Sequence, residues 1–270
     1  MNEIHSLRIV LYIFVVGQIA YLFELLALHI KEDFSDTGLF SWKILRLDYT
    51  PNNIAQNILD TLLGQSRFAK LIISEIICLL LLLFFEPYTW TFTIIALLAA
   101  LCLLIMQIRN TYGGDGSDQM ALILVISIVL GFSIFSSLLS TKYVLYFIAL
   151  QSCLAYAAAG VAKALSNKWR SGTAVYDIFS TGAYGSKSFS SLLNKTSYLS
   201  FLLSWNVILM EILFPVCLVV PPSVSIFILF WGFAFHVFNA IVMGLNSFFW
   251  MFIATYPAIL FVIKDLNIYQ

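Results

Sequence analysis

The residues best suited to chemistry lie in one stretch, AYAAAGVAKALSNKWRSGTAVY, from Ala155 to Tyr176. A helix of small apolar residues there runs into Lys163, and Trp169 and Gly172 follow it. A lysine at the centre of a membrane helix costs about 2.5–3.5 kcal/mol unless it has a partner, water or a task. Lys163 is therefore either a functional base or anchor, or a terminal lysine whose long stem reaches the lipid headgroups.

Other ionisable residues also lie inside apolar runs. Glu24, Glu75 and Glu211 occupy three different runs, and His236 lies in a fourth. Isolated carboxylates in hydrocarbon are costly, so we expect these groups to face the interior and to pair or protonate. They either hold helices in register through hydrogen bonds or take part in function. For His236 the pattern favours function, because Asn239 lies one helical turn away and shares its face.

A second polar cluster is the loop RNTYGGDGSDQ at positions 109–119. Its glycines allow tight turns, and Asp115 or Ser117 can cap the helix that follows. That explanation is purely structural. The functional alternative is a site for a polar or anionic group at the helix N-terminus, beside Arg109. The glycine spacing fits neither the P-loop nor GxGxxG, so no nucleotide site is expected.

Composition places these residues in a membrane protein. Hydrophobic residues make up 61% of the 270 residues and charged residues 10%, against about 25% charged in soluble domains. Spans need about 20 mostly apolar residues, and eight runs qualify. They lie near 7–30, 68–86, 88–108, 119–140, 143–165, 198–220, 223–244 and 247–264. These runs lack barrel-type alternation, so we expect an all-α polytopic membrane bundle of about eight helices. The first run is expected to remain as a permanent span.

The charges are balanced, 14 against 14, which gives no indication of a nucleic-acid partner. With eight spans, one face receives most of the cations: Lys31, Lys43, Arg46, Arg67, Lys70, Arg109, Lys163, Lys168, Arg170, Lys187 and Lys195. The other face receives Arg8, Lys142 and Lys264. The positive-inside rule makes the crowded face cytoplasmic. The four cysteines show no zinc spacing and there are three histidines, so no metal is expected.

Two stretches resemble a known family. The run YAAAGVAK at 156–163, with Trp169 and Gly172, is similar to the membrane part of the vitamin K-dependent gamma-carboxylases. There a lysine follows Tyr-Phe-Ile-Ala-Gly-Val and precedes Asp-Trp-x-x-Gly. The wider group is the horizontally transferred transmembrane (HTTM) domain proteins, which include small bacterial members of the sporulation-delaying protein B type. The run FHVFN at 235–239 resembles the family's Phe-His-x-x-Asn segment. In helix order the resemblance covers roughly residues 5–264, as one HTTM-like domain over 1–270.

The resemblance implies a chemistry. In the carboxylases the lysine deprotonates a reduced quinone, which reacts with oxygen and becomes a base strong enough to take a proton from a peptide glutamate. Lys163 and His236 would be the catalytic residues here, with a menaquinone or vitamin K-type quinol as cofactor. A neutral amine can accept a proton, whereas arginine stays charged. The same comparison implies these substrate-binding residues: Arg109, Asn110, Asp115, Asp118, Gln119, Trp169, Gly172, Tyr176 and Asn239. We expect Arg109, Asp115, Asp118 and Trp169 to converge with Lys163 and His236 on one polar pocket.

Departures from the family narrow the expected function. The carboxylases carry Asn-Asn-His in the polar turn, where this chain has Arg109-Asn110-Thr111. Their large peptide-gripping region outside the membrane has no counterpart in these 270 residues. We therefore expect a quinone-linked enzyme of the cell membrane that acts with a partner protein in maturing a secreted peptide toxin, such as a bacteriocin. The alternative is a non-catalytic protein that binds, exports or confers immunity to a hydrophobic peptide. The family places the lysine face outside the cell, contrary to the charge count.

Overall fold

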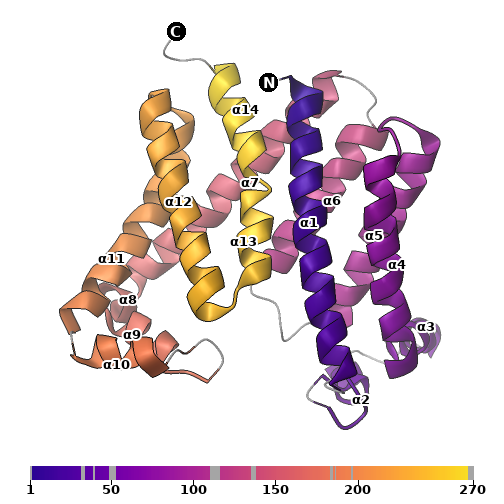
Figure 1. Ribbon diagram of the computed structural model, residues 1–270, viewed down its shortest axis with the longest axis horizontal. Helices are drawn as coiled ribbons and strands as arrows, with labels where there is room; N and C mark the ends of the chain where they lie inside the picture. Colours follow the sequence, from indigo (N-terminus) through magenta and orange to yellow (C-terminus); the bar gives the residue numbers. More distant parts are fainter. Residues whose placement is uncertain are drawn as a thin grey trace. The chain divides into compact units, whose positions relative to one another are not determined.

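The computed structural model describes residues 2–31, 34–38, 40–48, 53–109, 116–134, 138–182, 185, 187–195 and 197–266. Over these residues the secondary structure is helical and no strand occurs (Figure 1), which confirms the all-α class. The α-helices are α1 Glu3–Ile30, α2 Trp42–Leu45, α3 Asn53–Leu63, α4 Gln65–Phe84, α5 Trp90–Arg109, α6 Ser117–Val129, α7 Leu138–Leu165, α8 Asn167–Ser171, α9 Thr173–Phe179, α10 Lys187–Lys195, α11 Ser197–Leu213, α12 Pro222–Met243, α13 Asn246–Ile253 and α14 Tyr256–Leu266. Short 3-10 or π segments are η1 Arg46–Asp48, η2 Leu130–Ile134 and η3 Phe214–Leu218.

Six helical segments in the described residues are long and apolar enough to cross a membrane. They are Glu3–Ile30, Trp90–Arg109, Leu139–Leu165, Tyr198–Leu218, Pro222–Met243 and Asn246–Leu266. These six fit a multi-pass membrane protein, but they do not confirm the expected count of about eight. Of the other two expected spans, α4 carries three charged residues within its 20, and Ser117–Ser133 is a shorter apolar helix.

The last two apolar runs meet at a tight turn. Gly244 ends α12 in the left-handed conformation, with φ of 74°. Its N–H donates to the Ala240 carbonyl, as in the αL type of helix end, and the Leu245 N–H donates to the Asn239 carbonyl. The final apolar run is itself broken at residues 254–255, between α13 and α14. The Thr255 hydroxyl there donates to Ser152 on α7 at 2.9 Å.

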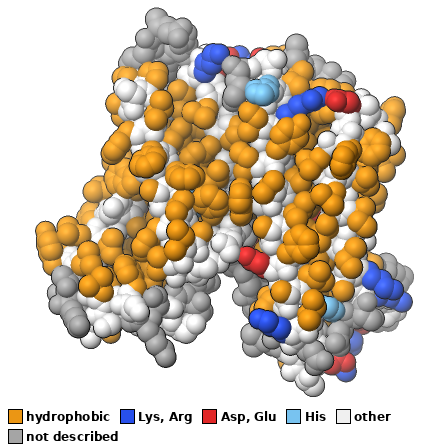
Figure 2. Space-filling view, in the orientation of Figure 1, with side chains coloured by type: hydrophobic (Ala, Val, Ile, Leu, Met, Phe, Trp, Pro, Cys, Tyr) orange, Lys and Arg blue, Asp and Glu red, His pale blue; other side chains and the backbone are white. Residues whose placement is uncertain are grey.

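The backbone divides into two compact units, residues 7–144 and residues 1–6 with 145–270. Helix α7 begins in the first unit and continues into the second. Whether the chain behaves as the single domain expected from the sequence stays a prediction. Each unit has its own core of buried apolar side chains. Figure 2 shows hydrophobic side chains along the lengths of the helices, with most Lys and Arg near helix ends.

In the unit of residues 7–144, α5 packs against α4 and α6. A buried hydrogen bond of 2.9 Å joins Gln18 on α1 to Glu75 on α4, so this carboxylate is paired as expected. At one end of the unit Arg8 forms an ion pair with Glu86. At the other end Trp42 and Leu63 form a small core against the last turn of α5. Since α5 separates the two ends, Arg8 lies at the opposite end of this unit from the cations of α2 and η1.

The topology of α5 can be tested by cysteine accessibility. Single cysteines replace Glu86 and Gln119, both exposed, in a background without the four native cysteines. We expect a membrane-impermeant maleimide to label the two positions from opposite sides of the membrane, because α5 is 20 residues long. Labelling of both positions from the same side would contradict a membrane-spanning α5.

Candidate functional site

Lys163 has a partner inside the helix bundle, the carboxylate of Glu211. In the unit that contains residues 145–270, its Nζ lies 2.7 Å from both carboxylate oxygens of Glu211 on α11. The Lys163 side chain is 21% exposed and that of Glu211 is 5% exposed. The pair is thus largely removed from solvent, with the lysine at its outer edge. This arrangement supports the reading of Lys163 as a residue with a partner inside the bundle.

The pair depends on a close approach of α7 and α11 at Gly160. A Cβ atom added at Gly160 would lie 2.8 Å from the Ile212 backbone nitrogen and 2.9 Å from the Glu211 Cβ. Real Cβ atoms do not approach neighbours this closely, so only glycine allows this packing. Lys163 lies three residues later on the same helical face. The small-residue run before Lys163 therefore brings Glu211 within reach of its amine.

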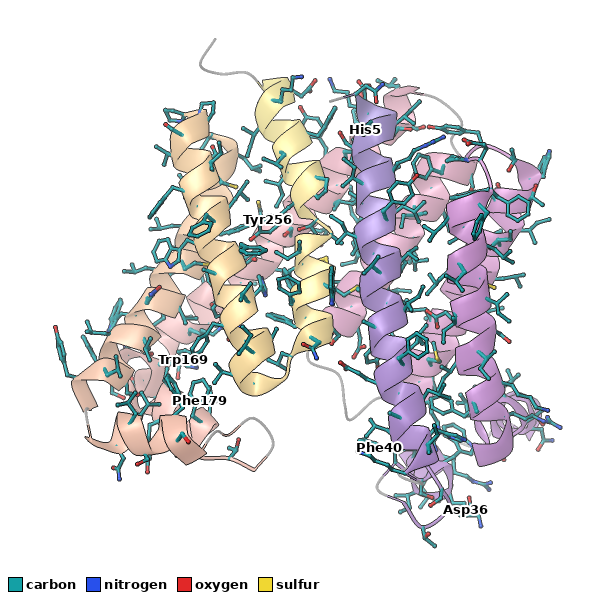
Figure 3. All side chains as sticks on the ribbon, viewed as in Figure 1. His5, Asp36, Phe40, Trp169, Phe179 and Tyr256 are labelled. Atoms are coloured by element: carbon teal, nitrogen blue, oxygen red, sulfur yellow. The ribbon has the colours of Figure 1, made fainter. Side chains whose placement is uncertain are left out.

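An aromatic ring borders the amine on its other side. The ring centroid of Trp169, on the short helix α8, is 5.2 Å from the Lys163 Nζ, within cation–π range. Figure 3 labels Trp169 together with Phe179 of the neighbouring helix α9. Gly172 has φ of 83°, a left-handed conformation that lets the chain turn from α8 into α9.

Hydroxyl groups of α11 hold α8 in this position. Ser204 donates to the Trp169 carbonyl and Ser200 to the Gly172 carbonyl, both at 2.5 Å. The Trp205 indole N–H donates to the Arg170 carbonyl at 3.2 Å. The last carbonyls of a helix have no hydrogen-bond donor within that helix. The side chains of α11 supply the missing donors at the end of α8. The same helix, α11, therefore supplies Glu211 and fixes Trp169.

A second polar contact lies deeper in the same unit. His236 on α12 is fully buried, and its Nε2 shares a hydrogen bond with the Tyr156 hydroxyl on α7. The imidazole stacks on Phe252 with a centroid distance of 5.0 Å, and Phe248 lies at 4.9 Å. Its Nδ1 has no hydrogen-bond partner among the described residues. Tyr156 precedes Lys163 by seven residues, which is two helical turns or about 10 Å.

These contacts form two polar pairs, each with one member on α7. Lys163 pairs with Glu211, and Tyr156, two turns earlier on the same helix, is hydrogen-bonded to His236. Asn239, one turn after His236, is also buried. Tyr176 lies on α9 and is 36% exposed. The structure thus joins Lys163 to Trp169 and Glu211, and His236 to Tyr156, and neither Glu211 nor Tyr156 was assigned to the site.

Arg109, Asp118 and Gln119 belong to the other compact unit. Arg109 is fully buried, the Asp118 carbonyl accepts a hydrogen bond from Gln107, and Gln119 is exposed. Asn110 and Asp115 lie outside the described residues. The single pocket expected to join Arg109, Asp115 and Asp118 to Lys163 therefore stays a prediction.

The sequence did not identify two of these residues, Glu211 and Tyr156, as part of the site. Glu211 was expected to pair or protonate but was not matched to Lys163, and Tyr156 was quoted only as part of the family run. A signal for Tyr156 was present, because residues 156, 160 and 163 have the spacing of one helical face. No comparable signal relates Glu211 to Lys163, since they lie 48 residues apart.

In the described ranges, no group of three or more His, Cys, Asp and Glu side chains is placed to hold a metal ion. No family model, curated protein or solved structure matches this chain. The resemblance to the HTTM group therefore rests on the residues around Lys163 and His236 and stays a prediction.

The contact at Gly160 yields a stability prediction. In Gly160→Ala the new methyl group meets backbone on α11, so α7 and α11 must separate. Overpacking of this kind typically costs about 1–3 kcal/mol. We expect a lower unfolding temperature in detergent for Gly160→Ala, and no comparable change for Ala162→Leu, because Ala162 is exposed. Equal stability of the two variants would contradict this packing.

The ion pair can be measured by a double-mutant cycle. Lys163→Met leaves a buried carboxylate without its cation, and such a loss costs about 3–5 kcal/mol. Adding Glu211→Met should recover most of this free energy of unfolding, because a packed apolar pair needs no desolvation. The control cycle uses Arg8 and Glu86, an exposed pair expected to contribute about 0–1 kcal/mol. Additive effects of Lys163→Met and Glu211→Met would mean that the two residues do not interact.

Proposed function

We propose that this chain is a multi-pass membrane enzyme of the HTTM and gamma-carboxylase-like kind, in which Lys163 and Glu211 move a proton of an apolar quinol-type substrate. The observation that carries the proposal is the largely buried Lys163–Glu211 pair beside Trp169. Coupling to the maturation of a secreted peptide toxin, with a partner protein, is the further part of the proposal and rests on the resemblance alone.

A lysine–carboxylate pair in an apolar bundle is suited to proton transfer. Its proton lies in short hydrogen bonds of 2.7 Å, between an amine and a carboxylate. An ion pair held largely away from water is stabilised by the attraction of its two charges and destabilised by the loss of their hydration. A proton taken up by the pair leaves it with one net positive charge, which the anion left on the deprotonated substrate balances. Arginine cannot replace lysine here, because its guanidinium stays protonated.

The surroundings of the pair fit an apolar, ring-shaped ligand. Lys163 is exposed by about one fifth, so a molecule at the bundle surface can reach its amine. Val161, Leu165 and Phe201, on the same two helices, are exposed apolar residues. A reduced quinone, when bound, would supply a phenolic O–H proton, and its two electrons would pass to dioxygen, the oxidant that the resemblance implies. Trp169 would border its ring, and Lys163 with Glu211 would receive the proton.

His236 has a positioning role in this proposal. Its imidazole is fully buried beside Phe248 and Phe252, where an ionised group without a partner would be costly. Its Nε2 is hydrogen-bonded to the Tyr156 hydroxyl, and Tyr156 lies two turns before Lys163 on α7. His236 therefore positions the part of α7 that carries the lysine, and Asn239 extends the same buried face.

The proposal is tested by activity in membranes that carry single variants. We expect Lys163→Arg and Glu211→Gln to lower quinol oxidation and peptide maturation by at least about hundredfold, since acid–base groups contribute about 10²–10⁴-fold. Lys168→Arg is the matched control, because Lys168 is exposed and pairs with Asp177. Both variants should remain inserted, since the arginine of Lys163→Arg can still pair with Glu211 and the glutamine of Glu211→Gln is uncharged.

The outcomes separate the two candidate functions. Full peptide maturation by Lys163→Arg would exclude proton transfer by this residue. Lys163 would then serve as a charged anchor for the peptide, as in a protein that binds, exports or confers immunity to it. If the wild-type chain oxidises quinol but does not change the peptide, the proposed quinol chemistry stands and the proposed role in peptide maturation is excluded.

A further inference from the structure

Arg109 ends α5 in an unusual setting, inside a cage of aromatic rings. Its side chain is fully buried. The guanidinium carbon lies 5.3 Å from the ring centroid of Phe34, 5.4 Å from that of Phe68 and 6.0 Å from that of Trp42. The Nη2 group donates to the Phe34 carbonyl at 3.1 Å. The three rings come from the segment after α1, from α4 and from α2, so the fold of this unit assembles the cage. Figure 3 labels Asp36 and Phe40 in the segment that also supplies Phe34.

Most of the hydrogen-bonding capacity of this guanidinium is unused. Nε and Nη1 are buried and have no hydrogen-bond partner among the described residues. Together they carry three N–H donors. Aromatic faces attract the positive charge but are weak acceptors of N–H groups. Buried donors in proteins are nearly always satisfied, so this set of open donors points to an acceptor from elsewhere.

The nearby carboxylates are engaged with other residues. Asp36 lies close enough to act on Arg109 electrostatically, but its carboxylate pairs with Lys43 at 2.7 Å. Asp60 accepts from the Trp42 indole at 2.7 Å and from Arg46 at 3.1 Å. Neither carboxylate hydrogen-bonds to Arg109 in this part of the structure. Within the described part of the chain, the positive charge at the end of α5 therefore has cation–π contacts but no bonded anion.

We propose that Arg109 binds a phosphate group at the membrane surface. Guanidinium donors match the several oxygens of a phosphate, and the bonds formed are charge-assisted. The site lies at the end of a membrane-spanning helix, where lipid phosphates lie. Ile44 and Leu47, beside the cage residue Trp42, are 64% and 77% exposed, which fits a segment lying in the bilayer interface. The phosphate comes from a lipid headgroup or from free phosphate, and the experiment separates these sources.

The test uses the purified full chain in detergent. Native mass spectrometry measures binding of phosphatidylglycerol, with phosphatidylcholine as the comparison lipid. Thermal unfolding is followed in parallel with inorganic phosphate and with chloride at equal ionic strength. The variants are Arg109→Gln and Arg109→Lys, and the control is Arg67→Gln, since Arg67 is exposed and bonds only the Thr61 carbonyl among the described residues.

We expect Arg109→Gln and Arg109→Lys to bind phosphatidylglycerol at least tenfold more weakly than the wild-type chain, and Arg67→Gln to bind within twofold of it. Lysine fails because it lacks the planar set of donors. Displacement of the lipid by inorganic phosphate, with a raised unfolding temperature of the wild-type chain, would assign the site to free phosphate. Binding of the lipid without such displacement would assign it to a headgroup.

Two results would overturn the proposal. One is equal binding of phosphatidylglycerol by the wild-type chain and both Arg109 variants. The other is a wild-type chain that neither binds the lipid nor responds to inorganic phosphate in thermal unfolding, which needs no variant to fold. In either case the aromatic rings alone hold the cation.

Discussion

The cost of placing charge in an apolar helix bundle governs this structure. A charged group inside such a bundle must find a partner, and breaking a buried pair costs about 3–5 kcal/mol. Lys163 meets this constraint through Glu211, at 2.7 Å from both oxygens. The partner is available only because Gly160 lets α7 and α11 approach each other closely. The glycine, the lysine and the glutamate therefore depend on one another, although 48 residues separate the two charged ones.

The same constraint is met differently elsewhere in the chain. Glu75 is held by a neutral amide, that of Gln18, and His236 by the Tyr156 hydroxyl. Arg109 is surrounded by aromatic rings, with donors left open among the described residues. Each of these two contacts leaves one buried atom, Glu75 Oε2 or His236 Nδ1, without a partner among the described residues, yet a neutral hydrogen bond can simply hold helices together. A buried ion pair is better suited to exchange a proton, and we therefore assign a function to Lys163. A buried cation with unused N–H donors is better suited to bind an anion, and we therefore assign a function to Arg109.

Helix α11 links packing and chemistry in the unit that contains Lys163. The hydroxyls of Ser200 and Ser204 donate hydrogen bonds to carbonyls at the end of α8. These bonds hold the Trp169 ring beside the lysine amine. Glu211, on the same helix, binds that amine from the other side. Because one rigid helix sets both contacts, a shift of α11 would move the carboxylate and the tryptophan together. The rigidity of this helix is thus a condition for a precisely placed amine.

The sequence by itself determined the helical class, the membrane character and the residues that attract attention, Lys163 and His236. The class and the membrane character follow from composition and from apolar runs of about 20 residues, and the two residues stand out as ionisable groups inside such runs. It did not determine the number of spanning helices, since α4 carries three charges and the run from Ser117 is short. Nor could it pair Lys163 with Glu211, or place Arg109 among Phe34, Trp42 and Phe68. Those contacts join segments far apart in the chain, and only tertiary packing decides which buried groups meet.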